Sequence, residues 1–160
     1  MSEKKVSVAY FSATGVTKNI AEKLADSIGA DLYEIKPAIP YSDADLNWMD
    51  KNSRSSVEMK DKSSRPEVVQ DDFIPQKYDV IFLGFPIWWY VAPHIVNNFL
   101  ESYDFAGKLI RPFFTSGGSG SGQTDDILHK SAPQAIWRPA KRLYANNEDR
   151  ISNWIKDIDV

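Results

Sequence analysis

Hydroxyl side chains are concentrated in a short segment near the start of the chain, between an apolar stretch and a helix-like pattern. Residues 12–17 read SATGVT, with three hydroxyl groups and one glycine. If a helix begins here, its first backbone N–H groups can hold an anion without help from a lysine, and Gly15 allows the backbone to approach closely. A helix cap needs only one serine or threonine. We therefore interpret this segment as a phosphate site, with simple helix capping as the alternative.

Aromatic side chains gather in a second segment, GFPIWWYVAP at residues 84–93, which follows a continuous apolar stretch. Trp88, Trp89 and Tyr90 are adjacent in it, and aromatic rings in this position can stack on a flat ring system. Tryptophan also commonly completes a hydrophobic core. We expect one of the two tryptophans to do so and the other to face a ligand, and the sequence leaves open which is which.

The third segment is rich in glycine and serine, TSGGSGSGQT at residues 115–124. It nearly matches three known motifs. A P-loop requires lysine where Gln123 stands, a hydrolase nucleophile elbow around Ser119 requires glycine where Ser121 stands, and a dinucleotide motif beginning at Gly118 requires glycine at position 123. Each motif lacks one essential residue. What remains is a loop with many backbone donors that can approach a flat polar ligand, and, taken alone, a flexible surface loop is an equally good interpretation.

The pattern of apolar residues predicts the elements that position these segments. An uncharged stretch at residues 6–11 predicts a strand buried on both faces, and helical spacing predicts a helix from Val16 to Ile28, ended by Gly29. Pro112 suggests that its strand lies at an edge or contains a bulge. Further strands are expected at 30–35, 78–86 and 108–115, a fifth within 132–143, and helices after Pro93, at 125–130 and at 151–158.

Residues 37–76 form a long polar segment without a clean period. A short helix around residues 44–51 is the only element that we expect in it. Segments of this length inside a compact domain are usually functional or stabilised by their own packing. Tyr41 and Trp48 are weaker candidates for covering a pocket. His94, in the first turn of the helix after Pro93, is expected to be exposed or to act as a cap.

The order of predicted elements alternates between strands and helices, which predicts an α/β fold with a doubly wound parallel sheet. We expect one domain over residues 1–160. In such sheets, ligands bind beyond the carboxyl ends of the strands. The three segments described above all lie there, so we expect a ligand site where they meet.

The composition narrows the function further. The net charge of −3 argues against nucleic acid as a partner, and no stretch is long and apolar enough to span a membrane. The chain has no cysteine, which excludes thiol catalysis, and only His94 and His129 could act as histidine metal ligands. With no cysteine and two histidines, we expect no bound metal. No signal-peptide pattern is visible, so we expect a cytoplasmic protein.

Three stretches, FSATGVTKNIAEKLA, GFPIWWYVAPHIVNNFLESYDFAGK and FFTSGGSGSG, together resemble the flavodoxins, in particular a short bacterial flavodoxin-like branch. The resemblance covers nearly the whole chain and implies a five-stranded sheet in the order 2-1-3-4-5 with non-covalently bound flavin mononucleotide (FMN). It implies that the ribityl phosphate is held by Ser12, Ala13, Thr14, Gly15, Val16 and Thr17. It also implies that the flavin ring is flanked by Pro86, Ile87, Trp88 and Trp89, and that its pyrimidine edge is bound by backbone donors of Thr115, Ser116, Gly117, Gly118 and Ser119.

The chain departs from the flavodoxin pattern in three ways. It is less acidic than many flavodoxins, which weakens electrostatic docking to a basic redox partner. The third segment lacks the tyrosine that often stacks on the flavin, which leaves one flavin face open. The second has no glycine from Pro86 to Pro93, where a peptide of many flavodoxins flips to bond the one-electron-reduced flavin. Without glycine, such a flip costs roughly 1–2 kcal/mol more, or about tenfold in population.

These observations favour an FMN-binding electron-transfer protein without catalytic residues of its own. The alternative is an FMN-dependent NAD(P)H:quinone-type reductase that transfers two electrons as hydride, since FPIWWYVAP is also similar to flavin quinone reductases of this fold. A third possibility is a phosphate-binding regulatory module without flavin. The expected partner is a redox protein or a small quinone-like acceptor, and we expect a monomer or a weak dimer.

Overall fold

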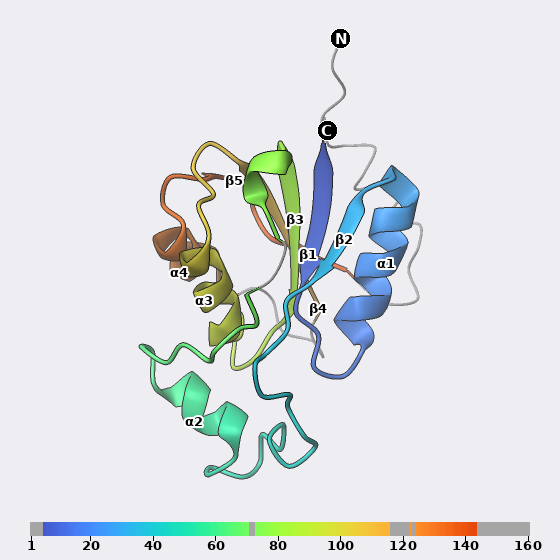
Figure 1. Ribbon diagram of the computed structural model, residues 1–160. Coiled ribbons are helices and arrows are strands. Elements are labelled where there is room, and N and C mark those ends of the chain that lie inside the picture. Colours follow the sequence, from blue (N-terminus) through green and yellow to red (C-terminus); the bar gives the residue numbers. More distant parts are fainter. Residues whose placement is uncertain (1–4, 71–72, 116–121, 123, 144–160) are drawn as a thin grey trace.

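A parallel sheet forms the centre of the computed structural model, which describes residues 5–70, 73–115, 122 and 124–143 (Figure 1). The main strands follow the order β2-β1-β3-β4-β5, and β6 pairs with β4. This confirms the expected α/β fold and the order 2-1-3-4-5. The strands are β1 (Val6–Tyr10), β2 (Asp31–Glu34), β3 (Val80–Pro86), β4 (Leu109–Thr115), β5 (Ile136–Trp137) and β6 (Lys141–Arg142).

Helices cover both faces of the sheet, as a parallel sheet requires. Figure 1 shows α1 on one face and α3 with α4 on the other. Alternate side chains of β1 serve the two cores: Val8 packs among the α1 residues, whereas Ala9 packs among those of α3. The helices are α1 (Val16–Ile28), α2 (Arg54–Lys60), α3 (His94–Ser102) and α4 (Thr124–Ser131), with a short 3-10 helix at Pro75–Lys77.

The expected fifth strand is divided in two, and the reason lies in β4. The carbonyls of Lys108, Ile110 and Phe114 accept hydrogen bonds from the β5–β6 side. Backbone polar groups of every second residue in a strand point to the same side, so the nitrogen of Pro112 also points toward β5 and β6. It has no proton to donate there. The pairing of β5 ends opposite Ile110 and that of β6 begins opposite Phe113. The expectation of an edge or a bulge at Pro112 was therefore wrong: β4 lies inside the sheet, and the adjacent strand is interrupted instead.

The long polar segment contains a helix, but not where the sequence suggested it. Residues 44–51 form turns, in which the Ser42 hydroxyl and the Asp45 carboxylate bond each other's backbone N–H groups. Such local bonds compete with helix formation. The helix is α2, which begins after Ser53, whose hydroxyl accepts the N–H of Ser56.

We call residues 39–66 the insertion. It leaves the fold through an antiparallel bridge between Pro37 and Val68 and extends past the carboxyl edge of the sheet (Figure 1). Its end is tied to α3 by an ion pair between Arg65 and Glu101 at 2.9 Å. His94 was expected to be exposed or to act as a cap. It is only 6% exposed and lies 2.6 Å from the Ser64 hydroxyl, and Pro93 occupies the cap position of α3 without a side-chain cap bond, so this expectation was wrong.

Several expectations fall on residues that the structure does not describe. The helix at 151–158 and the loop residues 116–121 lie outside the described residues. Among the described helices, none is long and apolar enough to cross a lipid bilayer.

Candidate cofactor site

The turn between β1 and α1 is built as an open helix end. Gly15 adopts a left-handed conformation with φ 95° and precedes the first helical residue, and no side chain caps it. The Ser12 hydroxyl accepts the N–H of Gly15 at 3.0 Å, which shapes the turn rather than capping the helix. The first N–H groups of α1 thus face outward from a turn with hydroxyl groups around them, the arrangement that suits an anion.

A buried pair of hydroxyl groups joins this turn to the end of β4. Thr17 and Thr115 are 1% and 7% exposed, and their side-chain oxygens lie 2.9 Å apart. The carbonyl of Thr115 also accepts the N–H of Ile87 at 2.9 Å. These bonds hold the ends of α1, β3 and β4 together, as expected for segments that follow parallel strands.

The aromatic segment forms a tight reverse turn. Trp88 and Val91 exchange two backbone hydrogen bonds of 2.8 and 3.2 Å, and between them Trp89 and Tyr90 have φ angles of 49° and 68°. Two successive left-handed residues define a type I′ turn, which glycine and asparagine normally occupy. Gly122 packs against this turn so closely that a Cβ there would lie 2.3 Å from the Tyr90 carbonyl oxygen.

The two tryptophans have different surroundings. Trp88 is half-buried, with its ring edge-on to Phe11 at 5.7 Å and to Tyr41 at 5.5 Å between centroids. Trp89 is 44% exposed. Both also line the cavity described below, so the expected division into one core tryptophan and one ligand-facing tryptophan is only partial.

Tyr41 supports Trp88 from behind through a polar cluster of the insertion. Its hydroxyl donates to the Glu58 carboxylate, and the Arg54 guanidinium lies 3.8 Å from its ring centre. Burial and the bond to Glu58 raise the pKa of Tyr41 far above its ordinary value of 10, so the phenol keeps its proton. Tyr41 therefore acts as packing for the aromatic wall.

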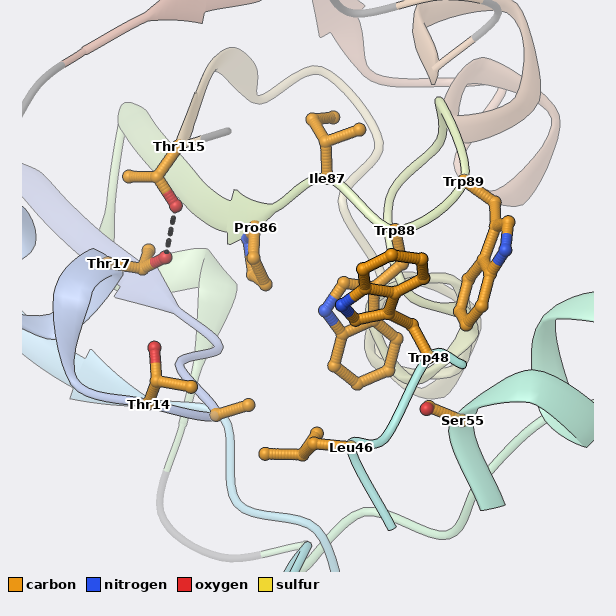
Figure 2. Close-up of a pocket in the computed structure, with 11 residues that line it drawn as sticks. Thr14, Thr17, Leu46, Trp48, Ser55, Pro86, Ile87, Trp88, Trp89 and Thr115 are labelled. Atoms are coloured by element: carbon orange, nitrogen blue, oxygen red, sulfur yellow. Dashed lines mark hydrogen bonds between the residues drawn. The ribbon is translucent and has the colours of Figure 1, made fainter. Parts of the chain in front are cut away.

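A cavity of about 350 Å³ opens where these parts meet (Figure 2). Hydroxyl groups from the turn and from β4 lie on one side of it and the tryptophans on the other. The sequence predicted the cavity residues Ala13, Thr14, Thr17, Pro86, Ile87, Trp88, Trp89 and Thr115, and proposed Trp48 as a weaker candidate.

The predicted site residues and the residues that line the cavity are not the same set. Ser12 and Gly15 of the turn do not line the cavity, and neither does Val16, the first residue of α1. Ser116, Gly117, Gly118 and Ser119 lie outside the described residues, so their assignment stays a prediction. Leu46 and Ser55 of the insertion line the cavity and were missed. Their segment has no period or motif that could have indicated them, and only the tertiary fold brings it to the sheet edge.

Comparison with known proteins agrees with this geometry. The family model of the flavodoxins matches residues 5–158. The chain is 46% identical to a provisionally assigned flavoprotein from Bacteroides eggerthii DSM 20697, over 99% of each chain and with a TM-score of 0.91. A second such protein, from Bacteroides uniformis ATCC 8492, is 44% identical over 98% of this chain and 100% of its own, also with a TM-score of 0.91.

A more distant structure shares the fold. It is a flavoprotein from Lactobacillus acidophilus NCFM in complex with FMN, 24% identical over 94% of this chain and 99% of that chain, with a TM-score of 0.70. The search of curated proteins finds no match. The family match spans β1 to the end of the described chain and includes the three segments singled out in the sequence, and we conclude that this chain belongs to the flavodoxin family.

Proposed function

We propose that this protein binds FMN and transfers electrons through it. The observation that supports this proposal best is the cavity at the carboxyl edge of the sheet, which has hydroxyl groups on one side and an aromatic wall on the other. A phosphorylated ring cofactor needs both features at once, because its phosphate requires donors and its ring requires a flat apolar surface. Bound FMN would supply one- and two-electron chemistry.

The residues of the cavity suit this cofactor. The open end of α1 and the hydroxyl groups of Thr14 and Thr17 would hold the phosphate, and Thr115 would contact the polar edge of the ring. Pro86 and Trp88 would flank the ring. The flavoprotein from Lactobacillus acidophilus, whose structure was solved with FMN, has the same fold, which adds support for this choice of cofactor.

A titration of FMN into the apoprotein tests the proposal. FMN fluorescence should be quenched at one equivalent, because aromatic side chains stack on the ring, and the protein should become yellow. A protein that takes up no FMN but binds inorganic phosphate would contradict it and would instead favour a phosphate-binding module.

The alternative is an FMN-dependent NAD(P)H:quinone-type reductase, and the Trp89–Tyr90 turn favours it. Flipping the Trp89–Tyr90 peptide would keep both bonds between Trp88 and Val91, but it would convert the turn to type II′. The first central position of a type II′ turn normally requires glycine, and Trp89 occupies it here. The structure therefore offers little help to chemistry that depends on such a flip.

Stepwise anaerobic reduction of the FMN-loaded protein separates the two functions. A carrier should pass through a spectrum that differs from those of both the oxidised and the fully reduced protein. Direct conversion between these two forms, together with turnover of NADH or NADPH and a quinone, would establish the reductase. We also propose that the electron acceptor is either a redox protein or a small quinone-like molecule. The same experiment bears on this choice.

A further inference from the structure

We propose that Trp48 and Ser55 of the insertion bind a flat aromatic ring with a hydrogen-bonding edge, and so form an additional wall of the cofactor cavity. This inference rests on the proposed function, because it concerns the same cavity. It adds a binding element from a segment that contributes none of the three loops recognised in the sequence.

Ser55 has a side chain that lacks a partner. It is 2% exposed, and its Oγ has no hydrogen-bond partner among the described residues. Figure 2 shows this oxygen pointing into the cavity that Ser55 helps to line. A buried hydroxyl without a partner costs free energy, so its placement at a cavity wall indicates that a ligand supplies the missing bond.

Trp48 has the complementary property, since it is an apolar ring that is not covered. It is 70% exposed although it lines the same cavity. A tryptophan ring at a cavity wall is well suited to stack on a planar ligand. Together the two residues offer one stacking surface and one hydrogen-bonding group.

The insertion holds these two residues in place from several sides. The backbone N–H of Ser55 donates to the Asp45 carbonyl at 3.0 Å, which connects the start of α2 to the turns around Trp48. Arg54 donates to the Ile39 carbonyl at 2.7 Å and pairs with Glu58 at 2.8 Å. The wall is thus fastened by backbone and side-chain bonds before any ligand arrives.

Two ligands have the chemistry that this wall recognises. One is the ring of the cofactor itself, whose polar edge could reach Ser55. The other is a free planar acceptor with ring carbonyls that enters beside the cofactor. Both place a flat ring against Trp48 and a polar atom at the Ser55 hydroxyl, so binding measurements with each ligand distinguish them.

The test compares wild type with Ser55→Ala and Trp48→Ala. Met49→Ala and Val57→Ala are the matched controls, because these neighbours are 75% and 55% exposed and do not line the cavity. FMN is titrated into each apoprotein. Menadione, a planar quinone, is then titrated into each FMN-loaded protein without a reductant, so that only binding is measured.

If the cofactor ring is the ligand, both cavity variants should bind FMN about 3–10-fold more weakly, and the controls should not. If a second ring is the ligand, FMN affinity should stay unchanged and the affinity for menadione should fall by a similar factor. Equal affinities for both ligands in all five proteins would overturn the inference and would mean that ordinary water satisfies Ser55.

Protein stability provides an independent readout. Since Ser55→Ala removes an unpartnered buried hydroxyl, the apoprotein should unfold at the wild-type temperature or above it, whereas a purely structural serine would lower that temperature. If wild type binds no FMN, the proposed function fails. Menadione is then titrated into the apoproteins, and the inference stands or falls by whether the two cavity variants bind it more weakly than the controls.

Discussion

At the scale of single residues, the hydroxyl pair of Thr17 and Thr115 should contribute both to the stability of the protein and to its affinity for FMN. Both side chains are buried and lie 2.9 Å apart at the cavity. Thr17→Val keeps the shape of the side chain but removes its hydroxyl, and leaves Thr115 without this partner. We expect a loss of about 1–3 kcal/mol in the free energy of unfolding and about tenfold weaker FMN binding. Urea unfolding and FMN fluorescence measure the two effects.

Ser27→Ala is the control for this prediction. It lies on the same helix, and its exposed hydroxyl donates to the Lys23 carbonyl, away from the cavity. This variant should keep wild-type affinity for FMN. Unchanged FMN binding by Thr17→Val would contradict the assignment of this hydroxyl to the phosphate site.

The Trp89–Tyr90 turn makes a second prediction at this scale. Each non-glycine residue in the left-handed region costs roughly 1–2 kcal/mol, and Tyr90 is in this region with φ 68° and is 67% exposed. Tyr90→Gly relieves this strain, although glycine also loses about 0.5–1 kcal/mol through greater freedom when unfolded. The net change in the free energy of unfolding should lie between zero and a gain of about 1.5 kcal/mol.

Val57→Gly is the control for this prediction, because glycine there should only destabilise the protein. Val57 is exposed on α2, where the backbone has ordinary helical angles, so glycine should cost about 0.5–1 kcal/mol. Urea unfolding of both variants gives the comparison. If Tyr90→Gly destabilises the protein as much as Val57→Gly does, the turn is not strained.

At the scale of the elements, the regular parts of the fold could be predicted from the sequence and the irregular parts could not. The helix expected from Val16 to Ile28 was found with these bounds, because apolar spacing and Gly29 define it locally. Pro112 was misread because its effect falls on the neighbouring strand, which only the register reveals. α2 was missed because a seven-residue helix is too short to show a clear period.

The junction between the insertion and α3 predicts a dependence on pH. Burial lowers the pKa of His94 below its ordinary value of 6.5, and the Arg65 guanidinium lowers it further, against the attraction of Glu58 and Asp61. When the pH falls below about 6.5, His94 becomes protonated in the unfolded chain while it is still neutral in the folded protein. The contribution of His94 to stability is therefore full above this pH and falls as the solution becomes more acidic.

Urea unfolding at pH 7.5 and pH 6.0 measures this effect in wild type and in His94→Gln. Wild type should lose more stability between the two pH values than the variant does, since glutamine does not titrate. The comparison cancels other titrating groups and the loss of the contact between His94 and Ser64. Equal losses in both proteins would contradict the prediction.

At the scale of the whole molecule, the position of the cavity could be predicted, but the wall that the insertion contributes to it could not. The rule that ligands bind at the carboxyl ends of parallel strands correctly brought Thr14, Trp88 and Thr115 to one cavity. Leu46 and Ser55 reach the same cavity through the path of the insertion, which depends on the Pro37–Val68 bridge and the contacts with α3. Such long-range contacts leave no local pattern in the sequence.

The central sheet and the insertion should differ in their rates of amide hydrogen exchange. Amides of β1, β3 and β4 are paired within a buried sheet and should exchange most slowly, whereas the turns at residues 42–52 are largely exposed and should exchange fastest. FMN should slow exchange in these turns, because a ligand against Trp48 and Ser55 restrains the insertion that carries them. Amides of β5, which pairs with the opposite end of β4 from the cavity, should not change and are the control. Exchange in residues 42–52 that is equally fast with and without FMN would mean that the cofactor occupies the cavity without engaging the insertion.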